Sequence, residues 1–247
     1  MTILCIETST SVCSAAICKD GKPFKQCMNK EGSSHARLLP LYIENLLQSA
    51  REEGLTIDAA ALSEGPGSYT GLRIGTSTAK GLCYGLNIPL IPVPTLAVLC
   101  QAAKERLEVR GERLEEDALL CPMIDARRME VYSAICDSRD WRLEIGDWQF
   151  PQAQAVVVEN EESLYTVHRT PYTIYYFGDG AAKCQSVLTS PNWHYIPDIV
   201  PEAQYVGVLA ERIFVHRTPY TVHQLSYYEP YYLKEFIAAT SHIKGLN

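Results

Sequence analysis

The sequence predicts an α/β protein with two lobes. Strands precede helices twice: three strands and then alternating helices and strands fill residues 1–110, and a new strand hairpin follows them. Apolar residues make up 47% and charged residues 21%, the balance of a globular chain that buries a core. We assign residues 1–110 to a first lobe and residues 111–247 to a second, whose C-terminal tail could pack back on the first.

The first lobe begins with three predicted strands, at Ile3–Ile6, Val12–Cys18 and Lys22–Met28. The pair Asp20-Gly21 is typical of a tight hairpin turn between the second and third. The turn after the first strand, residues 7–11, is polar and rich in hydroxyl groups.

A helix follows, with Ser34 as the expected N-cap and Gly54 as its end. Pro40 lies inside it and leaves two alternatives open, because proline is comfortable only in a first turn: the helix starts near Leu39, or it is kinked there. Its apolar residues recur at helical spacing: Leu38, Leu39, Tyr42, Ile43, Leu46, Leu47 and Ala50.

Two more strand–helix units complete this lobe. After a strand at Ile57–Leu62, the glycine-rich segment 65–71 turns the chain into a helix over Tyr69–Leu86, and Asn87 stands where it should stop. A strand at Ile88–Val93 leads to Thr95, the expected N-cap of a third helix that runs to about residue 109.

The second lobe is predicted to begin with a hairpin, Leu119–Ile124 and Met129–Cys136, joined by residues 125–128. Strands at 156–158 and 173–177, a short helix after Gly180 and a helix over 203–214 follow, and the tail segment 227–234 is rich in tyrosine. The heptapeptide 167–173 recurs unchanged at 215–221, and its Thr-Pro favours surface loops.

Composition argues against several function classes. The net charge of -7 makes RNA binding through this chain alone unfavourable, because an acidic chain repels phosphates. The nine cysteines form no C-x-x-C pair, as expected of reduced thiols in a cytoplasmic protein. We find neither a signal peptide nor a run of apolar residues long enough for a membrane span.

Few residues are arranged for chemistry. The glycine-rich segment matches neither the dinucleotide fingerprint nor the P-loop, so a tight turn is favoured over phosphate binding. The six histidines and nine cysteines show no metal-ligand spacing, and we expect no metal. Glu7 and Asp125 follow strands, where catalytic acids often lie, yet each can equally accept bonds from loop amides.

Gly71, Gly75 and Ala79 lie four residues apart and line one face of the second helix. Glycine inside a helix costs about 1 kcal/mol relative to alanine, so close approach of another element is expected there. That element could belong to this chain or to a partner.

The chain resembles the TsaB/TsaD group in three segments: Ile6-Glu7-Thr8-Ser9, the string from Gly65 to Gly75, and Lys80-Gly81-Leu82. The segments 124–132 and 230–234 are similar to parts of the TsaB (YeaZ) family. The resemblance implies two lobes of the actin, hexokinase and Hsp70 type. It also implies a role in placing a threonylcarbamoyl group on tRNA.

Within this group, TsaD-like proteins carry a metal-binding H-x-x-x-H where this chain has Thr95 and Leu99. Leucine cannot bind a metal, so the resemblance points to TsaB, the non-catalytic subunit. It implies a heterodimer with TsaD, recruitment of the ATPase TsaE, a homodimer when alone, contact with tRNA only through the complex, and no cofactor except ATP or ADP at the interface with partners.

The resemblance implies that TsaD contacts the helices of the first lobe. We expect a bulky residue at Gly75 to block docking while the chain still folds. The alternatives are an active small-molecule kinase of the same superfamily and a metallopeptidase, which the absent histidine pair disfavours. The expected partner-interface residues are Leu39, Tyr42, Ile43, Leu46, Tyr69, Leu72, Arg73, Gly75, Thr76 and Lys80.

Overall fold

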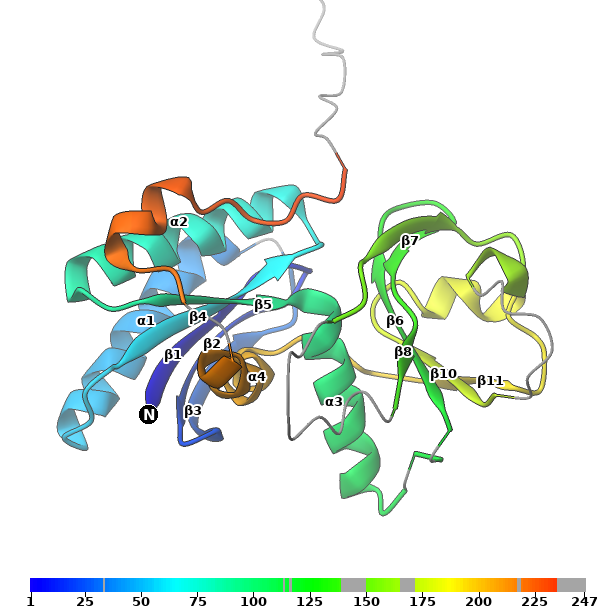
Figure 1. The fold of residues 1–247 in the computed structure, drawn as a ribbon, viewed down its shortest axis with the longest axis horizontal. Helices are drawn as coiled ribbons and strands as arrows, with labels where there is room; N and C mark the ends of the chain where they lie inside the picture. Colours follow the sequence, from blue (N-terminus) through cyan, green and yellow to red (C-terminus); the bar gives the residue numbers. More distant parts are fainter. Residues whose placement is uncertain are drawn as a thin grey trace, which may run out of the picture.

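The structure is a computed structural model, and it describes residues 1–32, 34–112, 114–115, 117–138, 150–164, 172–216 and 219–234. Two sheets lie side by side with helices between them and outside the first sheet (Figure 1). The first repeat of the heptapeptide therefore falls mostly outside the described residues.

The first sheet has the order β3-β2-β1-β4-β5. Its strands are β1 (Thr2–Glu7), β2 (Cys13–Lys19), β3 (Lys22–Asn29), β4 (Ala59–Gly65) and β5 (Leu90–Pro94). The three N-terminal strands are antiparallel, and β1, β4 and β5 run parallel. Asp20 and Gly21 adopt the left-handed backbone that the predicted tight turn requires.

The second sheet repeats this plan, with the order β11-β10-β6-β7-β9 and β8 paired beside β6. Its strands are β6 (Leu119–Asp125), β7 (Glu130–Ser133), β8 (Cys136–Asp137), β9 (Gln154–Val157), β10 (Ile174–Phe177) and β11 (Trp193–Ile196). The directions also match: β6, β7 and β9 are antiparallel, whereas β6, β10 and β11 are parallel. The predicted long second hairpin strand is wrong, because β7 ends at Ser133 and Cys136 starts the separate strand β8.

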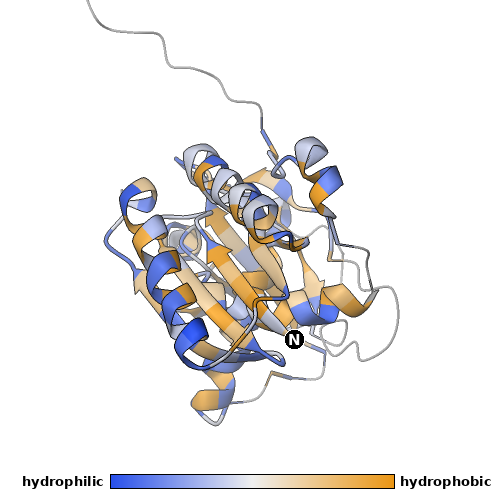
Figure 2. Ribbon diagram, turned by 90° about the vertical axis from the view of Figure 1, so that its left-hand side faces the viewer, coloured by the Kyte–Doolittle hydropathy of each residue, from blue (hydrophilic) through white to orange (hydrophobic). Residues whose placement is uncertain are grey.

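The helices differ between the lobes. In the first lobe, α1 (His35–Glu52) and α2 (Tyr69–Leu86) are long, whereas η2 (Glu161–Ser163) and η3 (Ala182–Ser186) stand at the corresponding places in the second. Because these are short 3-10 helices, only the first sheet has an outer layer of long helices among the described residues. Figure 2 shows that its strands are largely apolar, while the helices turn polar residues outward.

The ends of the long helices follow the sequence with two exceptions. Gly54 and Asn87 adopt left-handed backbone just after α1 and α2, as predicted. Helix α1 starts at His35 and contains Pro40, so the alternative of a start near Leu39 is wrong. Ser34 precedes α1, but its hydroxyl donates to the carbonyl of Gly32 instead of capping the helix.

Two helices fill the space between the sheets. Helix α3 (Thr95–Val109) connects the lobes and packs on both β4 and β6, and α4 (Ala203–His216) follows the second sheet but packs on β1 and β2 of the first. Their apolar residues join strands of both sheets in one core. The two lobes are therefore held together by buried apolar contact.

The C-terminal segment up to residue 234 also lies on the first lobe. After α4, Tyr220 pairs with Leu90 of β5, and η4 (Val222–Tyr227) packs on α2. Residues 203–234, which the sequence placed in the second lobe with a tail that could return, thus cover both faces of the first sheet (Figure 1).

Gly207 sets how closely α4 approaches the sheet. A Cβ there would lie 2.6 Å from the Cβ of Cys18 and 2.9 Å from the Sγ of Cys5. We expect Gly207→Ala to lower the free energy of unfolding by about 1–3 kcal/mol, the usual cost of overpacking, despite alanine's better helix propensity.

The matched control is Gly85→Ala in α2, where nothing lies within 4 Å of an added Cβ. This variant should be as stable as the wild type or more stable by up to about 1 kcal/mol. Urea unfolding of both variants provides the measurement, and a Gly207→Ala protein at wild-type stability would contradict this account of α4.

Candidate functional site

The ten residues predicted at a partner interface fall into three groups, which are buried, half-buried and exposed. Six of them are buried within the chain and belong to its own interior, so the prediction of partner contact is wrong for these six: Leu39, Ile43, Leu46, Leu72, Gly75 and Thr76. Apolar periodicity marks the inner face of an amphipathic helix, and this face meets the sheet. Tyr42, Tyr69 and Lys80 are half-buried, and Arg73 is exposed.

The small face of α2 packs inside the chain. A Cβ at Gly71 would overlap the carbonyl oxygen of Thr8, and one at Gly75 would overlap its Oγ1. The Thr8 hydroxyl donates to the carbonyl of Gly71 at 2.8 Å. The docking interpretation of Gly71 and Gly75 is therefore wrong, and a leucine at Gly75 would destabilise the fold itself.

The outer faces of α1 and α2 carry accessible apolar groups that the sequence analysis missed. Leu41 of α1 is 55% exposed and Tyr84 of α2 is 76% exposed. Gly81 and Gly85 of α2 also face open space, with nothing within 4 Å of an added Cβ. Helical periodicity could have separated these positions from the inner glycines, because residues three and four apart share a face.

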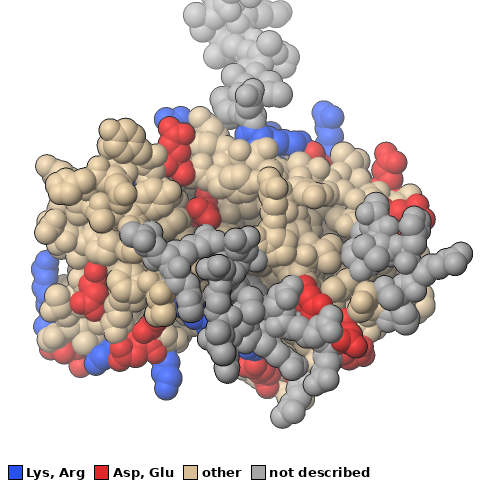
Figure 3. Space-filling model, in the orientation of Figure 1, with Lys and Arg blue, Asp and Glu red and all other residues tan. Residues whose placement is uncertain are grey.

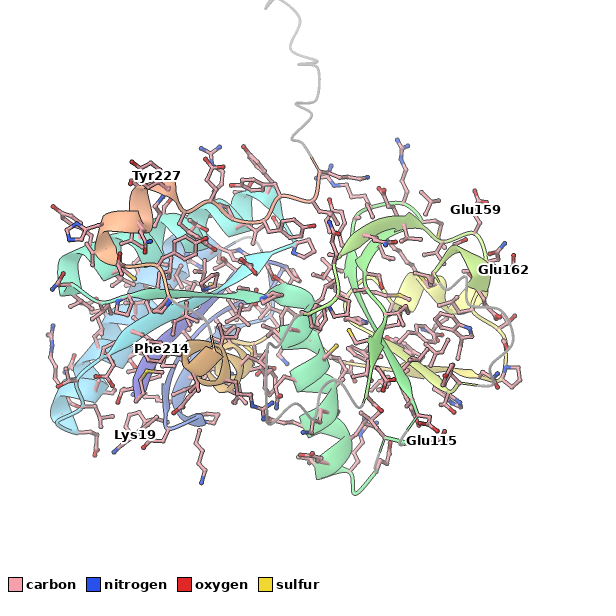
Figure 4. All side chains as sticks on the ribbon, viewed as in Figure 1. Lys19, Glu115, Glu159, Glu162, Phe214 and Tyr227 are labelled. Atoms are coloured by element: carbon pink, nitrogen blue, oxygen red, sulfur yellow. The ribbon has the colours of Figure 1, made fainter. Side chains whose placement is uncertain are left out.

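The C-terminal segment covers one flank of α2 (Figure 1). Lys80 Nζ donates to the carbonyl of Tyr228 at 2.9 Å, and the rings of Tyr69 and Tyr232 lie 4.9 Å apart. Tyr231 N donates to the carbonyl of Glu64 at 2.7 Å. Lys80 and Tyr69 thus hold residues 228–232 in place, whereas Tyr227 projects from η4 into solvent (Figure 4).

The glycine-rich turn is closed by the chain itself. Ser68 N donates to the carbonyl of Ser9 at 2.6 Å, and a Cβ at Gly67 would lie 2.8 Å from the Cβ of Ser9. Leu72 N donates to the carbonyl of Ser68 at 2.8 Å. The Ser68 hydroxyl accepts a bond from Gly71 N at 3.4 Å, so the N–H groups of Ser68 and Gly71 are both used within the chain.

Glu7 is a buried carboxylate with partners from its own lobe. Ser9 donates to Oε1 through N at 2.6 Å and through its hydroxyl at 2.5 Å, and the Ser63 hydroxyl donates to Oε2. Burial raises the pKa of Glu7 above its ordinary value, although the bonds from Ser63 and Ser9 oppose the shift. The group orders the turn after β1, and it does not face open space.

Asp125 ends β6 as Glu7 ends β1, but its side chain is 48% exposed. It forms an ion pair with Lys183 and accepts a bond from Arg127 N at 3.0 Å. Asp179 accepts from Asp125 N at 3.1 Å, and burial raises the pKa of Asp179.

A pocket of about 350 Å³ opens between the lobes. Pro66 and Leu96 line it from the first lobe, Phe150 and Gln152 from the second, and Tyr231 from the C-terminal segment. Its lining includes neither Glu7 nor Asp125. The two carboxylates proposed as alternative catalytic groups therefore do not meet in this pocket.

The positions that would hold a metal in TsaD-like proteins have structural roles here. Thr95 is the first residue of α3, not its N-cap, and its hydroxyl accepts a bond from Gly65 N at 3.1 Å. Leu99 is fully buried in the core shared by the lobes. Within the described ranges, no group of three His, Cys, Asp or Glu residues is placed to hold a metal ion. Nor does any helix there combine the length and apolar character of a membrane crossing.

Comparison with known proteins finds similarity to both TsaD and TsaB proteins, and the matches differ in how much of each protein they cover. The family model "TsaD: tRNA N6-adenosine threonylcarbamoyltransferase" matches residues 30–145. A Bacillus subtilis protein of that name is 34% identical over 113 residues, but these cover only 33% of its length. The tRNA threonylcarbamoyladenosine biosynthesis protein TsaB of Haemophilus influenzae is 30% identical over 239 residues, which cover 95% of this chain and 94% of that protein. The chain belongs to the TsaB family.

Other TsaB family members agree. The Escherichia coli TsaB protein is 34% identical over 64% of this chain and 62% of its own length. The solved structure of YeaZ from Pseudomonas aeruginosa superposes with a TM-score of 0.70 and 25% identity, covering 94% of this chain and 99% of that one. The predicted two-lobed fold is confirmed, and family membership connects the chain with tRNA threonylcarbamoyladenosine biosynthesis.

Because Glu7 is buried, the stability of the fold should depend on pH. Its pKa is raised in the folded state, so the folded protein holds this proton more tightly than the unfolded chain does. The free energy of unfolding should therefore fall as pH rises from the ordinary pKa of a glutamic acid through the raised one.

Glu7→Gln should remove this part of the slope, because a glutamine does not titrate. Urea unfolding of both proteins across acid to neutral pH measures the difference. Parallel pH profiles for wild type and Glu7→Gln would show that Glu7 is ionised in the folded protein at its ordinary pKa.

Proposed function

We propose that this chain is a non-catalytic subunit in tRNA threonylcarbamoyladenosine biosynthesis, and that it docks a TsaD protein on the outer faces of α1 and α2. The observation that carries the proposal is the open outer face of α2. There, Gly81 and Gly85 stand beside the exposed ring of Tyr84. We call Leu41, Gly81, Tyr84 and Gly85 the docking face.

The docking face has features that this chain's own packing does not require. Each exposed glycine costs a helix about 1 kcal/mol relative to alanine, and nothing in this chain approaches Gly81 or Gly85. A second helix could approach closely at such positions, as small residues allow elsewhere. Exposed leucine and tyrosine side chains beside them supply apolar area and an aromatic anchor.

A TsaD protein is a suitable occupant because it resembles this chain where the docking face lies. The TsaD family model matches residues 30–145, which contain α1 and α2. Two related lobes can therefore present similar helix layers to each other. The same reasoning predicts that the chain alone pairs with a second copy through this face.

Several features support a role without catalysis. The glycine-rich turn is filled by Ser9, and Glu7 is bonded within its lobe. Thr95 and Leu99 are used in packing and hydrogen bonding. We propose that the chain works in the cytoplasm, that it helps recruit the ATPase TsaE, that any ATP or ADP binds only at the interface with partners, and that tRNA is reached within the complex.

The docking face can be tested by copurification with the TsaD protein of the same organism. Tyr84→Ala and Gly81→Leu should each weaken the pair at least tenfold, because loss of an aromatic anchor commonly costs about 2 kcal/mol and a leucine blocks close approach. Both positions face solvent, so the free energy of unfolding should be unchanged or, for Gly81→Leu, raised.

Val157→Glu in β9 is the matched control, because Val157 is 54% exposed, nearly as much as Leu41, but lies on the second lobe. It should copurify normally. Full recovery of TsaD by the Tyr84 and Gly81 variants would refute this docking face.

The non-catalytic role needs a separate assay. The purified chain should neither hydrolyse ATP nor modify tRNA, and adding it to TsaD and TsaE should increase threonylcarbamoylation. Steady ATP turnover by the chain alone would favour the kinase alternative, and full activity of TsaD and TsaE without it would refute the proposed role.

A further inference from the structure

The turn between β6 and β7 carries two arginines on unfavourable backbone. Arg127 has a φ of 72° and Arg128 a φ of 52°, and both side chains are exposed. Left-handed backbone favours glycine, asparagine or aspartate, as at Asp20-Gly21 in the β2–β3 turn of the first sheet. Arginine costs about 1–3 kcal/mol at such a position, so the turn itself does not explain either residue.

Two lysines join these arginines. Lys183 forms an ion pair with Asp125 and donates to the carbonyl of Glu130 at 2.7 Å, and Lys234 forms an ion pair with Glu130. The two carboxylates of the turn are thereby neutralised. Within the described part of the chain, neither guanidinium of the turn has an ion-pair partner, so a local excess of positive charge remains on an acidic protein.

Aromatic side chains lie beside these basic residues and beside Arg73 of the first lobe. Tyr232 lies two residues before Lys234, and its ring is 4.9 Å from that of Tyr69. The guanidinium of Arg73 lies 5.4 Å from the centre of the Tyr69 ring. Tyr132 of β7 lies near Lys234 and Arg127, which oppose the burial that raises its pKa.

These side chains lie on α2, on the C-terminal segment and on the β6–β7 turn, and the ion pair of Lys234 with Glu130 joins the C-terminal segment to the second lobe. Figure 3 shows lysine and arginine side chains along the corresponding upper edge of the molecule. The strip consists of Tyr69, Arg73, Arg127, Arg128, Tyr232 and Lys234, and we call it the basic-aromatic strip.

We propose that the basic-aromatic strip contacts a single-stranded segment of RNA. Guanidinium and ammonium groups bind phosphates along a strand, and tyrosine rings stack on unpaired bases of any identity. An extended strip spanning both lobes suits a strand better than it suits one nucleotide. That the RNA is a tRNA rests on the proposed function. Because the chain as a whole is acidic, the contact should be weak alone and strengthened when a partner also holds the RNA.

The test replaces the two arginines by residues that suit left-handed backbone. Arg127→Asn/Arg128→Gly should be at least as stable as the wild type, since the turn is relieved of strain. Its complex with TsaD should bind a labelled tRNA anticodon-arm RNA about tenfold more weakly at about 0.1 M salt. The slope of log affinity against log salt should fall by about 1.4, because each of the two phosphates that the arginines neutralise on a single strand accounts for about 0.7.

The matched control is Lys19→Ala/Lys22→Ala, which removes two charges beside the Asp20-Gly21 turn. Lys19 lies at the lower edge of the molecule, away from the strip (Figure 4). The control should leave the RNA affinity unchanged. Equal weakening by both double variants would mean that net charge alone matters, and unchanged affinity in the arginine variant would overturn the proposal.

Three further results separate this proposal from others. Normal copurification of the arginine variant with TsaD is expected, and failure to copurify would make the strip a protein interface instead. Displacement of RNA by equimolar ATP would indicate a mononucleotide site and overturn the proposal. If no pair with TsaD forms, ultraviolet crosslinking of the chain alone to the same RNA at low salt should still label peptides that contain Tyr69 or Tyr232, and failure to label them would overturn the inference.

Discussion

The first lobe depends on the contact between α2 and the turn after β1. Gly71 and Gly75 leave room for Thr8, whose hydroxyl bonds the helix backbone, and Ser68 N bonds Ser9. This contact fixes the glycine-rich turn against Ser9 and sets the position of α2 on the sheet. It therefore decides two properties together: Gly71 and Gly75 are turned into the chain, and Gly81 and Gly85 on the opposite face of α2 are left exposed.

The two lobes share one sheet plan but differ in what covers it. Long helices lie outside the first sheet, whereas short 3-10 helices stand at the corresponding places of the second among the described residues. Among the described residues, the layer of long helices that the proposed docking requires is thus found on the first lobe. The second lobe contributes exposed charge at its β6–β7 turn, and the C-terminal segment carries tyrosines and Lys234 from one lobe to the other. Proposed protein docking and proposed RNA contact consequently lie on different parts of the surface.

Much of the first lobe could be predicted from local sequence signals. Asp20-Gly21, Gly54 and Asn87 are turn and end signals that depend on backbone conformation, and each lies where expected. The second lobe was predicted less well, because β7, β8 and β11 are short and a few residues carry little periodicity. For the interface, apolar spacing identified Leu39, Ile43 and Leu46, but the same spacing describes any helix face that is buried, and these residues face the sheet of their own chain.

The sequence by itself determined the α/β class, the order of elements in the first lobe and, through its motifs, the resemblance to the TsaB family. Only the tertiary structure decided that residues 203–234 return to the first lobe, that Gly71 and Gly75 face inward while Gly81 and Gly85 face outward, and that Lys234 meets Glu130. The physical reason is that turns, caps and periodicity act between near neighbours in the chain. Which of two glycine pairs is covered depends instead on contacts between residues far apart in sequence, and these exist only once the lobes are packed.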